Sequence, residues 1–483
     1  MKPPLACVKC RLRKKKCDRA YPICSSCLRT HDRCEYRVSS SSNKPPIRLP
    51  LTQTPDSDQV SRPTGFEGKF LGYPFFPDKF IGDSTSNIPI PSDLQSFVIG
   101  DDNLRQHITD FLEETDLFCM PFIPRQDLEV KLLSQIRQLN GAAILLLACI
   151  KILGQQVQDD PRSNPQYLVI KTGFVSAEVN GFLTVRLLQA LLLLLFYEFS
   201  HGIYPSAFIT LGTCTRYLAA LGINGGSLSF EDTNNWIEAE TRRRLWWAVY
   251  SMERIMMLGY PKGTLLLKEP DKNENLPSDD VSWDQAYPSP EAYLTLLSPA
   301  KSEMSSFRLL VHAAYLIGRV LQHASDDHLP LQAYNEKGAQ IYRTICALMT
   351  VLDNETRSAI IPVSVPRGVL NSAVFLLYSI SACGGDQSNV EYFEPARKSS
   401  AAIFLSRARL FFEGNLRDIF KPSPFLTHWG FHVYQYFYAI YRQEGHSESL
   451  QVLKDLEKAF EILGKRWKLT EVYVTLLNDM QAS

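Results

Sequence analysis

Six cysteines within the first 34 residues constrain this chain more than any other feature. They form two triplets with the same internal spacing, and the second triplet repeats the first after 17 positions. Zinc prefers four tetrahedral ligands, so two ions need eight ligand positions, and six thiolates supply them only if two sulfurs bridge. The spacing therefore predicts a cluster of two zinc ions. The predicted ligands are Cys7, Cys10, Cys17, Cys24, Cys27 and Cys34.

Two other uses of these cysteines are less consistent with the sequence. A disulfide framework is disfavoured because the N-terminus has no apolar run typical of a secretory signal. Two separate mononuclear sites would need eight ligands, and only His31 is available as an extra one. The segment also contains hardly an apolar side chain, so we expect it to fold only when metal is bound.

The segment from Cys7 to Cys34 resembles the fungal zinc binuclear cluster family in its cysteine spacing, its basic content and the proline Pro22 between the two triplets. The resemblance implies that Cys7 and Cys24 are the bridging sulfurs. It also implies a nuclear transcription factor for RNA polymerase II genes that binds CGG-type triplets in double-stranded DNA and acts with the transcription machinery. Activation is the family's usual mode, and repression stays open.

Charge is concentrated at the same end of the chain. Residues 1–37 carry eleven basic and three acidic side chains, a net charge of +8, which leaves −8 for the rest. Such a basic head favours binding to the phosphates of a nucleic acid. The resemblance singles out Lys14, with Arg13 beside it, as the base-reading candidate, and the run can also serve as a nuclear import signal. The predicted DNA contacts are Lys9, Arg11, Arg13, Lys14, Lys15, Lys16 and Arg19.

Composition divides the chain into four segments, which predict a small zinc-binuclear-cluster domain and a large all-α regulatory domain joined by a disordered linker. Residues 1–37 are the cluster domain, and 38–65 are a linker rich in serine and proline. Residues 66–100, aromatic but broken by Gly and Pro, are expected to form an irregular strap. Residues 101–483 show helical periodicity. Because no apolar heptad follows the cysteines, a homodimer is left open.

One stretch of the predicted helical domain, from Glu240 through Arg254 to Pro261, resembles the signature helix of the middle homology domain of fungal regulators. Its apolar residues recur at helical steps of three and four, so we expect one buried face with Arg242 and Arg243 exposed. The pair Trp246 and Trp247 is interpreted as core. A long interruption without helical periodicity follows, from Gly259 to Pro290.

The sequence does not favour an enzyme, because it has no Walker-type loop, no GxGxxG and no GxSxG motif. His428 and His432 are four residues apart and could share a metal, but we interpret them as core or surface histidines. The longest apolar run is too short to span a bilayer. A compact chain without a coiled coil resembles the pathway-specific regulators of secondary-metabolite gene clusters, and the resemblance implies such a role. A metabolite-sensing regulator of primary metabolism is the alternative, a small-molecule effector stays open, and an enzyme with a DNA-binding head is weaker.

Overall fold

A computed structural model describes residues 6–7, 9–10, 13–20, 24–30, 34, 88–114, 118–132, 134, 139–155, 159–225, 236–287, 294–326, 328–356, 364–383, 387–412 and 422–482. The chain divides into two compact units, Met1–Arg62 and Pro63–Ser483. The predicted linker, 38–65, and most of the predicted strap, 66–87, lie outside the described residues.

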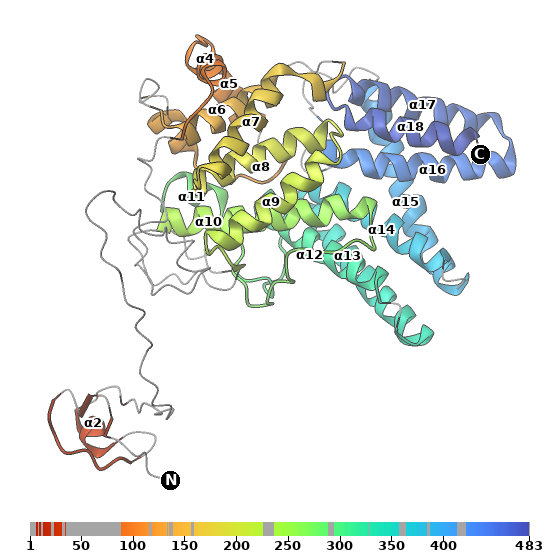
Figure 1. Ribbon diagram of the computed structural model, residues 1–483. Coiled ribbons are helices and arrows are strands. Elements are labelled where there is room, and N and C mark those ends of the chain that lie inside the picture. Colours follow the sequence, from red (N-terminus) through yellow and green to blue (C-terminus); the bar gives the residue numbers. More distant parts are fainter. Residues whose placement is uncertain are drawn as a thin grey trace, which may run out of the picture. The chain divides into compact units, whose positions relative to one another are not determined.

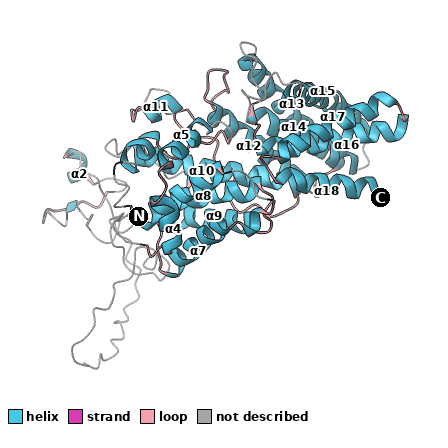
Figure 2. Cartoon of the chain, turned by 90° about the horizontal axis from the view of Figure 1, so that it is seen from above, coloured by secondary structure: helices cyan, strands magenta, loops and turns pink. Residues whose placement is uncertain are grey.

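The described part of the larger unit is built from helices, and its only β-type pairing is an isolated bridge between Asn275 and Thr295 (Figures 1 and 2). The predicted all-helical domain is therefore confirmed. Its α-helices are α4 (Ser92–Ile99), α5 (Leu104–Glu114), α6 (Gly141–Gly154), α7 (Pro165–Val179), α8 (Val185–Ser200), α9 (Ser206–Ala220), α10 (Trp236–Met256), α11 (Asp280–Asp284), α12 (Ser306–Ala324), α13 (Leu331–Thr356), α14 (Val365–Cys383), α15 (Gln387–Phe412), α16 (Thr427–Glu444), α17 (Ser447–Gly464) and α18 (Leu469–Ala482). Short π or 3-10 turns are η3 (Asp127–Leu132), η5 (Pro161–Ser163), η8 (Met257–Gly259) and η10 (Pro424–Leu426). No helix of the described residues is long and apolar enough to cross a membrane.

Helix α4 corrects one prediction, since it lies within the segment expected to be irregular. Pro91 occupies its N-cap position, and the next eight residues contain neither Gly nor Pro. Leu94 and Val98, one helical turn apart, are 1% and 0% exposed and join the main core. The breakers that suggested an irregular strap therefore end at Pro91, and burial of one apolar stripe stabilises the helix from Ser92 onward.

The main core is formed where α6, α8, α10 and α12 pack against their neighbours. In α6 every residue from Gly141 to Ile150 is buried, and in α8 the buried run extends from Leu187 to Ser200. Helices that are apolar on all sides belong inside a protein rather than on its surface. The leucine-rich stretch of the sequence is therefore the centre of this unit.

Helix α10 corrects a second prediction, because it is buried on nearly every side. The indole rings of Trp246 and Trp247 are 7% and 0% exposed, which confirms their assignment to the core. Arg243, expected to be exposed, is also buried and pairs with Glu240. Arg242 is only partly exposed and pairs with Glu238 one turn away. The helix thus buries charged side chains as well as its apolar stripe. Each buried charge needs an opposite charge or a hydrogen-bond partner, because an unpaired charge inside a protein is strongly unfavourable.

These buried charges hold the long irregular segment after α10. Glu240 accepts a hydrogen bond from the backbone N–H of Ser278 at 2.7 Å, and Arg244 donates to the carbonyl of the same residue at 2.8 Å. The indole N–H of Trp247 donates to the carbonyl of Asn275 at 2.9 Å. Side chains of α10 thus satisfy backbone groups that have no helix or sheet of their own. This explains how residues 260–279, between η8 and α11, are held in place.

The last four helices, α15–α18, form a second apolar cluster at the C-terminal end of the larger unit (Figure 1). Trp429 of α16 is 1% exposed and donates its indole N–H to Ser400 Oγ of α15 at 2.9 Å. Phe460 of α17 and Leu477 of α18 complete the centre of the cluster. Trp467, in the turn between α17 and α18, instead joins the main core.

Candidate metal centre and nucleic-acid interface

The smaller unit brings all six predicted ligands together. The sulfurs form two groups of four, and within each group all sulfurs lie within 4.8 Å of one another. One group is Cys7, Cys10, Cys17 and Cys24, and the other is Cys7, Cys24, Cys27 and Cys34. Cys7 and Cys24 therefore belong to both groups. This is the arrangement that two four-coordinate ions require when six sulfurs must fill eight ligand positions.

The sulfur spacing fits zinc rather than disulfides. The Sγ atoms of Cys7 and Cys24 are 3.8 Å apart, those of Cys7 and Cys27 3.7 Å, and those of Cys10 and Cys24 3.6 Å. A tetrahedron with zinc–sulfur bonds of about 2.3 Å has edges of about 3.8 Å. A disulfide would bring two sulfurs to about 2.05 Å. The six side chains thus have the donor type, the number and the spacing of a binuclear zinc site.

The two halves of the site repeat one local structure. The backbone N–H of Cys10 donates to Cys7 Sγ at 3.4 Å, and the backbone N–H of Cys27 donates to Cys24 Sγ at the same distance. In each Cys-x2-Cys step the chain thus turns so that the second cysteine donates to the sulfur of the first. The repeat seen in the sequence is therefore a repeat of geometry.

An acidic residue that was not predicted to be functional links the two halves. Asp18 follows Cys17 directly, and its carboxylate accepts the backbone N–H of Ser25 at 3.1 Å and also the Ser25 hydroxyl. Ser25 begins the short helix α2 (Ser25–Arg29) of the second half. These hydrogen bonds from Ser25 hold the pKa of Asp18 below its usual value. The corresponding position 17 residues later is Glu35, which lies outside the described residues.

The thiols of the site differ in acidity. Burial raises the pKa of Cys7 well above its usual value and that of Cys27 to about 12. At Cys24 burial also acts to raise the pKa, but donation from the Cys27 backbone N–H and from neighbouring thiols lowers it to about 6. Zinc binds thiolates, so its binding releases the protons of the less acidic sulfurs.

The basic run leaves the cluster through a tight turn that presents its side chains to solvent. The backbone N–H of Lys15 donates to the carbonyl of Cys10 at 3.0 Å, and Lys14 has a φ of +52°. A bond of this span with a left-handed residue inside it ends a helical turn as a Schellman motif does. Lys14, Lys15 and Lys16 are all exposed. A non-glycine residue in this conformation could not have been predicted from the cysteine spacing.

The other predicted DNA contacts lie around this turn. Arg13 and Arg19 are exposed and Lys9 is half-buried, while Arg11 lies outside the described residues. The eleven basic and three acidic residues of 1–37, combined with about −2 from two zinc ions and six thiolates, leave a charge of about +6. A small body with this charge is suited to binding phosphates.

The pair His428 and His432 was interpreted as structural, and its hydrogen bonds fit that interpretation. Their Nε2 atoms are 3.1 Å apart, His428 Nδ1 is 2.9 Å from the Tyr473 hydroxyl, and His432 Nδ1 is 3.1 Å from Gln435 Oε1. One assignment of tautomers satisfies the whole chain, with Tyr473 donating to His428, His428 to His432, and His432 to Gln435. The two neutral rings thus tie α16 to α18.

Comparison with protein families gives two matches to this chain. Residues 5–43 match the fungal Zn(2)-Cys(6) binuclear cluster domain, and residues 143–371 match the fungal specific transcription factor domain. The first match contains all six cysteines of the metal centre. The second contains most of the main core and ends before the cluster formed by α15–α18.

Three curated relatives are similar to parts of the chain. Transcription factor BOA15 of Botryotinia fuckeliana is 35% identical over 128 residues, which are 26% of this chain and 72% of the relative. An uncharacterized transcriptional regulatory protein of Schizosaccharomyces pombe is 24% identical over 53% of this chain and 38% of the relative. The pigment biosynthesis transcriptional activator pigB of Monascus ruber is 26% identical over 28% of this chain and 26% of the relative. The chain therefore spans well under half the length of the last two.

Proposed function

The chain belongs to the fungal Zn(2)-Cys(6) transcription factors, and we propose that it acts in the nucleus, where its zinc cluster reads a specific DNA site and its helical domain regulates RNA polymerase II transcription. The observation that carries this proposal is the sharing of Cys7 and Cys24 between two groups of four sulfurs, beside an exposed basic turn. The family is one of transcription factors and not of enzymes.

All six cysteines are the proposed zinc ligands, with Cys7 and Cys24 bridging the two ions. Zinc supplies the cross-links that a segment with almost no apolar side chains cannot obtain from a core of its own. Asp18 adds a polar link between the two halves through Ser25. The residues of the chain thereby fix the position of the basic turn, which is the part that meets DNA.

Base reading is assigned to Lys14, with Arg13 beside it, because lysine and arginine donate to the O6 and N7 acceptors of guanine. Lys9, Arg11, Lys15, Lys16 and Arg19 are assigned to phosphates, which fix the register without reading sequence. A CGG-type triplet is the proposed target. Support comes from the exposure of the turn and from the charge of the unit.

The proposed role is activation of a secondary-metabolite gene cluster. It is supported by the similarity to the Monascus ruber protein, whose name describes an activator of pigment biosynthesis. Repression, or regulation of primary metabolism in response to a metabolite, is the alternative. Contact with the transcription machinery and a small-molecule effector are further parts of the proposal, and the chain can bind as a monomer or as a homodimer.

Two measurements on the full-length protein test the proposal. Native mass spectrometry should find two zinc ions per chain, and selection from random DNA should enrich sites that contain a CGG-type triplet. The spacing of enriched triplets distinguishes a monomer from a homodimer. Intramolecular disulfides among the six cysteines, or zinc-loaded protein that enriches no sequence, would contradict the proposal.

A further inference from the structure

Helix α7 is apolar on two opposite faces, and only one of them lies in the core. Ile170 and Phe174 are on the inner side and are 0% and 3% exposed. On the opposite side Leu168, Val175 and Val179, at helical steps of seven and four, are 50%, 54% and 81% exposed. Because a helix that is apolar all round normally lies inside a protein, the outward face of α7 has the composition of a covered surface.

Helix α9 extends this apolar surface, since Phe208 and Ile209 are 48% and 61% exposed. Both helices pack against the buried helix α8 (Figure 1). Lys171 Nζ of α7 is 2.6 Å from Glu198 Oε1 of α8 and 2.7 Å from Thr210 Oγ1 of α9. Single exposed apolar side chains are common, but several of them on neighbouring helices mark an interaction site. We call this set the α7–α9 face: Leu168, Val175, Val179, Phe208 and Ile209.

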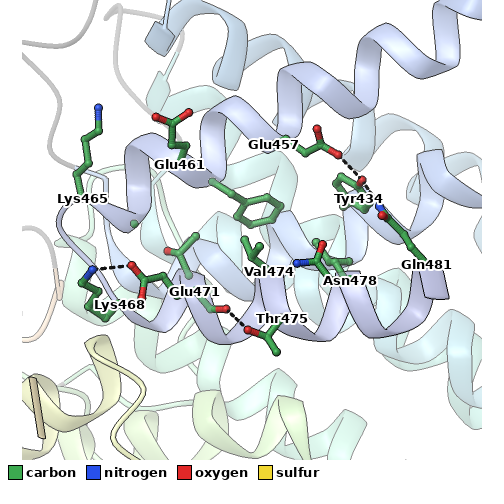
Figure 3. Close-up of a pocket in the computed structure, with 14 residues that line it drawn as sticks. Tyr434, Glu457, Glu461, Lys465, Lys468, Glu471, Val474, Thr475, Asn478 and Gln481 are labelled. Atoms are coloured by element: carbon green, nitrogen blue, oxygen red, sulfur yellow. Dashed lines mark hydrogen bonds and ion pairs between the residues drawn. The ribbon is translucent and has the colours of Figure 1, made fainter. Parts of the chain in front are cut away.

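The C-terminal cluster of helices contains a hollow that is a weaker candidate for an interaction site. It has a volume of about 770 Å³ and lies between α16, α17 and α18 (Figure 3). Its floor residues Tyr434, Phe460 and Leu477 are only 1%, 2% and 3% exposed, so it offers almost no apolar surface to a ligand. The side chains of the α7–α9 face are 48% to 81% exposed, and this face therefore has apolar area to bury.

The N-terminal part of the chain joins the larger unit beside this face. Ile88, the first described residue of the unit, is 3% exposed. The Ser176 hydroxyl of α7 donates to the carbonyl of Pro89 at 3.3 Å. Ser176 is the next residue after Val175, so the chain that precedes Ile88 is attached to α7 within one turn of the exposed stripe.

The segment that precedes this attachment is rich in apolar side chains, although it lies outside the described residues. Half of the residues in 66–81 are large and apolar: Phe66, Phe70, Leu71, Tyr73, Phe75, Phe76, Phe80 and Ile81. An extended chain spans about 3.3 Å per residue, so Ile81 reaches about 23 Å from Ile88, and the aromatic residues before it reach further. The stripe from Leu168 to Val179 is only about 17 Å long. Covalent attachment raises the local concentration of such a segment to about the millimolar range, which favours it over a second copy or another protein.

We infer that residues 66–81 dock on the α7–α9 face and cover it with their aromatic side chains. The segment belongs to the same compact unit as the face, and the burial of apolar area on both sides drives the contact. The inference goes beyond the proposed function and does not rest on it, because the zinc cluster takes no part in the contact. Docking fixes the point on the helical domain from which the chain continues toward the zinc cluster.

The test places a photo-crosslinking residue, p-benzoylphenylalanine, at one position of the full-length, zinc-loaded protein. In place of Val175 or Phe208 of the α7–α9 face, it should form links to peptides of 66–81 within the same chain. In place of Leu331 of α13, which is 62% exposed, it should form such links with a yield at least about tenfold lower. If both face positions link to a second copy, or to no peptide of 66–81, the inference is wrong.

Matched substitutions test whether the aromatic side chains make the contact. One variant carries serine in place of four phenylalanines of the segment: Phe70, Phe75, Phe76 and Phe80. The control carries serine in place of four apolar residues of the predicted linker: Ile47, Leu49, Leu51 and Val60. The first variant should lower the yield of links from both face positions by at least about fivefold, because it removes the apolar area to be buried. The control should leave the yield within about twofold, and equal yields from the two variants would overturn the inference.

Selection from random DNA with the same proteins separates this inference from the proposed function. Links between the α7–α9 face and 66–81 in a protein that enriches no DNA sequence would contradict the proposed function alone. Sequence-specific DNA binding without such links would contradict the docking alone.

Discussion

Replacing Lys14 by glycine or by alanine separates its proposed contact with DNA from the strain in its backbone. Lys14 is exposed, carries the proposed base-reading amine and has a φ of +52°. A left-handed conformation costs a non-glycine residue about 1–2 kcal/mol. Lys14→Gly removes this strain, but glycine loses about 0.5–1 kcal/mol more in conformational entropy on folding. The central values of the two ranges differ by about 0.75 kcal/mol, so the net gain in stability is of that order, while Lys14→Ala keeps the strain.

The two variants should lose the same DNA contact. A lysine on a guanine edge contributes about 1–3 kcal/mol of discrimination, so both should lower the ratio of specific to random DNA affinity by about 5- to 150-fold. Only Lys14→Gly should also hold zinc better, by about two- to fivefold in a chelator competition, because folding of this unit is coupled to metal.

The assay combines fluorescence anisotropy on the selected site and on random DNA with zinc transfer to a chromogenic chelator. Lys16→Ala serves as control, because this exposed residue is assigned to a phosphate and has no positive φ. It should weaken all sequences alike. Equal losses on selected and random DNA for Lys14→Ala would refute base reading, and identical zinc retention by the Gly and Ala variants would refute the strain.

Three further predictions concern stability. Arg244→Met should destabilise the helical domain by about 3–5 kcal/mol in urea unfolding, because Arg244 is fully buried and its loss takes one of two guanidinium partners from the buried Glu240 and leaves the carbonyls of Pro121 and Ser278 without their donor. Arg242→Met, which breaks a partly exposed pair, should cost less than about 1 kcal/mol. His201 and His323 are 7% and 1% exposed, and burial, with nearby cationic side chains adding to it, lowers their pKa values to about 3 and about 4. Below pH 6.5 the unfolded chain takes up protons that these neutral rings refuse, so His201 and His323 together should lower the free energy of unfolding by at most about 4 kcal/mol between pH 6.5 and 5. His312 and His432, whose pKa values burial lowers to about 4, add to this fall, and Glu274, whose pKa burial raises to about 7, acts against it. The buried histidines outnumber this carboxyl group, so no fall at all would contradict their burial. Asp18→Asn should speed zinc loss to the chelator, because the amide oxygen is a weaker acceptor for the start of α2, and unchanged loss would show that this link is dispensable.

The metal centre could be predicted from the sequence because its chemistry depends on the number and spacing of one residue type. Two equal cysteine triplets require shared sulfurs whatever the rest of the chain does, and the structure places Cys7 and Cys24 in both groups. The helical domain was equally predictable, since runs such as Ala190–Leu195 are apolar on every side and must be buried.

The features that could not be predicted depend on contacts between distant parts of the chain. Arg243 belongs to a polar sequence and was expected in solvent, yet it is buried because Glu240 on the preceding turn neutralises it. The residues that line the hollow beside Tyr434 likewise come from three helices, α16, α17 and α18, and lie together only in the folded chain. Neither the burial of Arg243 nor the lining of this hollow follows from a periodicity or a residue spacing in the sequence.

Lys14 shows why a local rule can fail at a functional position. Glycine is the residue that fits a left-handed turn end without strain, and a chain selected only for stability would carry it there. A lysine at this place keeps an unfavourable backbone conformation that the surrounding zinc ligands can enforce, since binding of structural zinc contributes about 10–16 kcal/mol to small domains of this kind. The free energy of zinc binding is much larger than the backbone strain at position 14, so the domain stays folded with a lysine there. The turn therefore ends the helix with the residue that DNA recognition needs rather than the one that the backbone prefers.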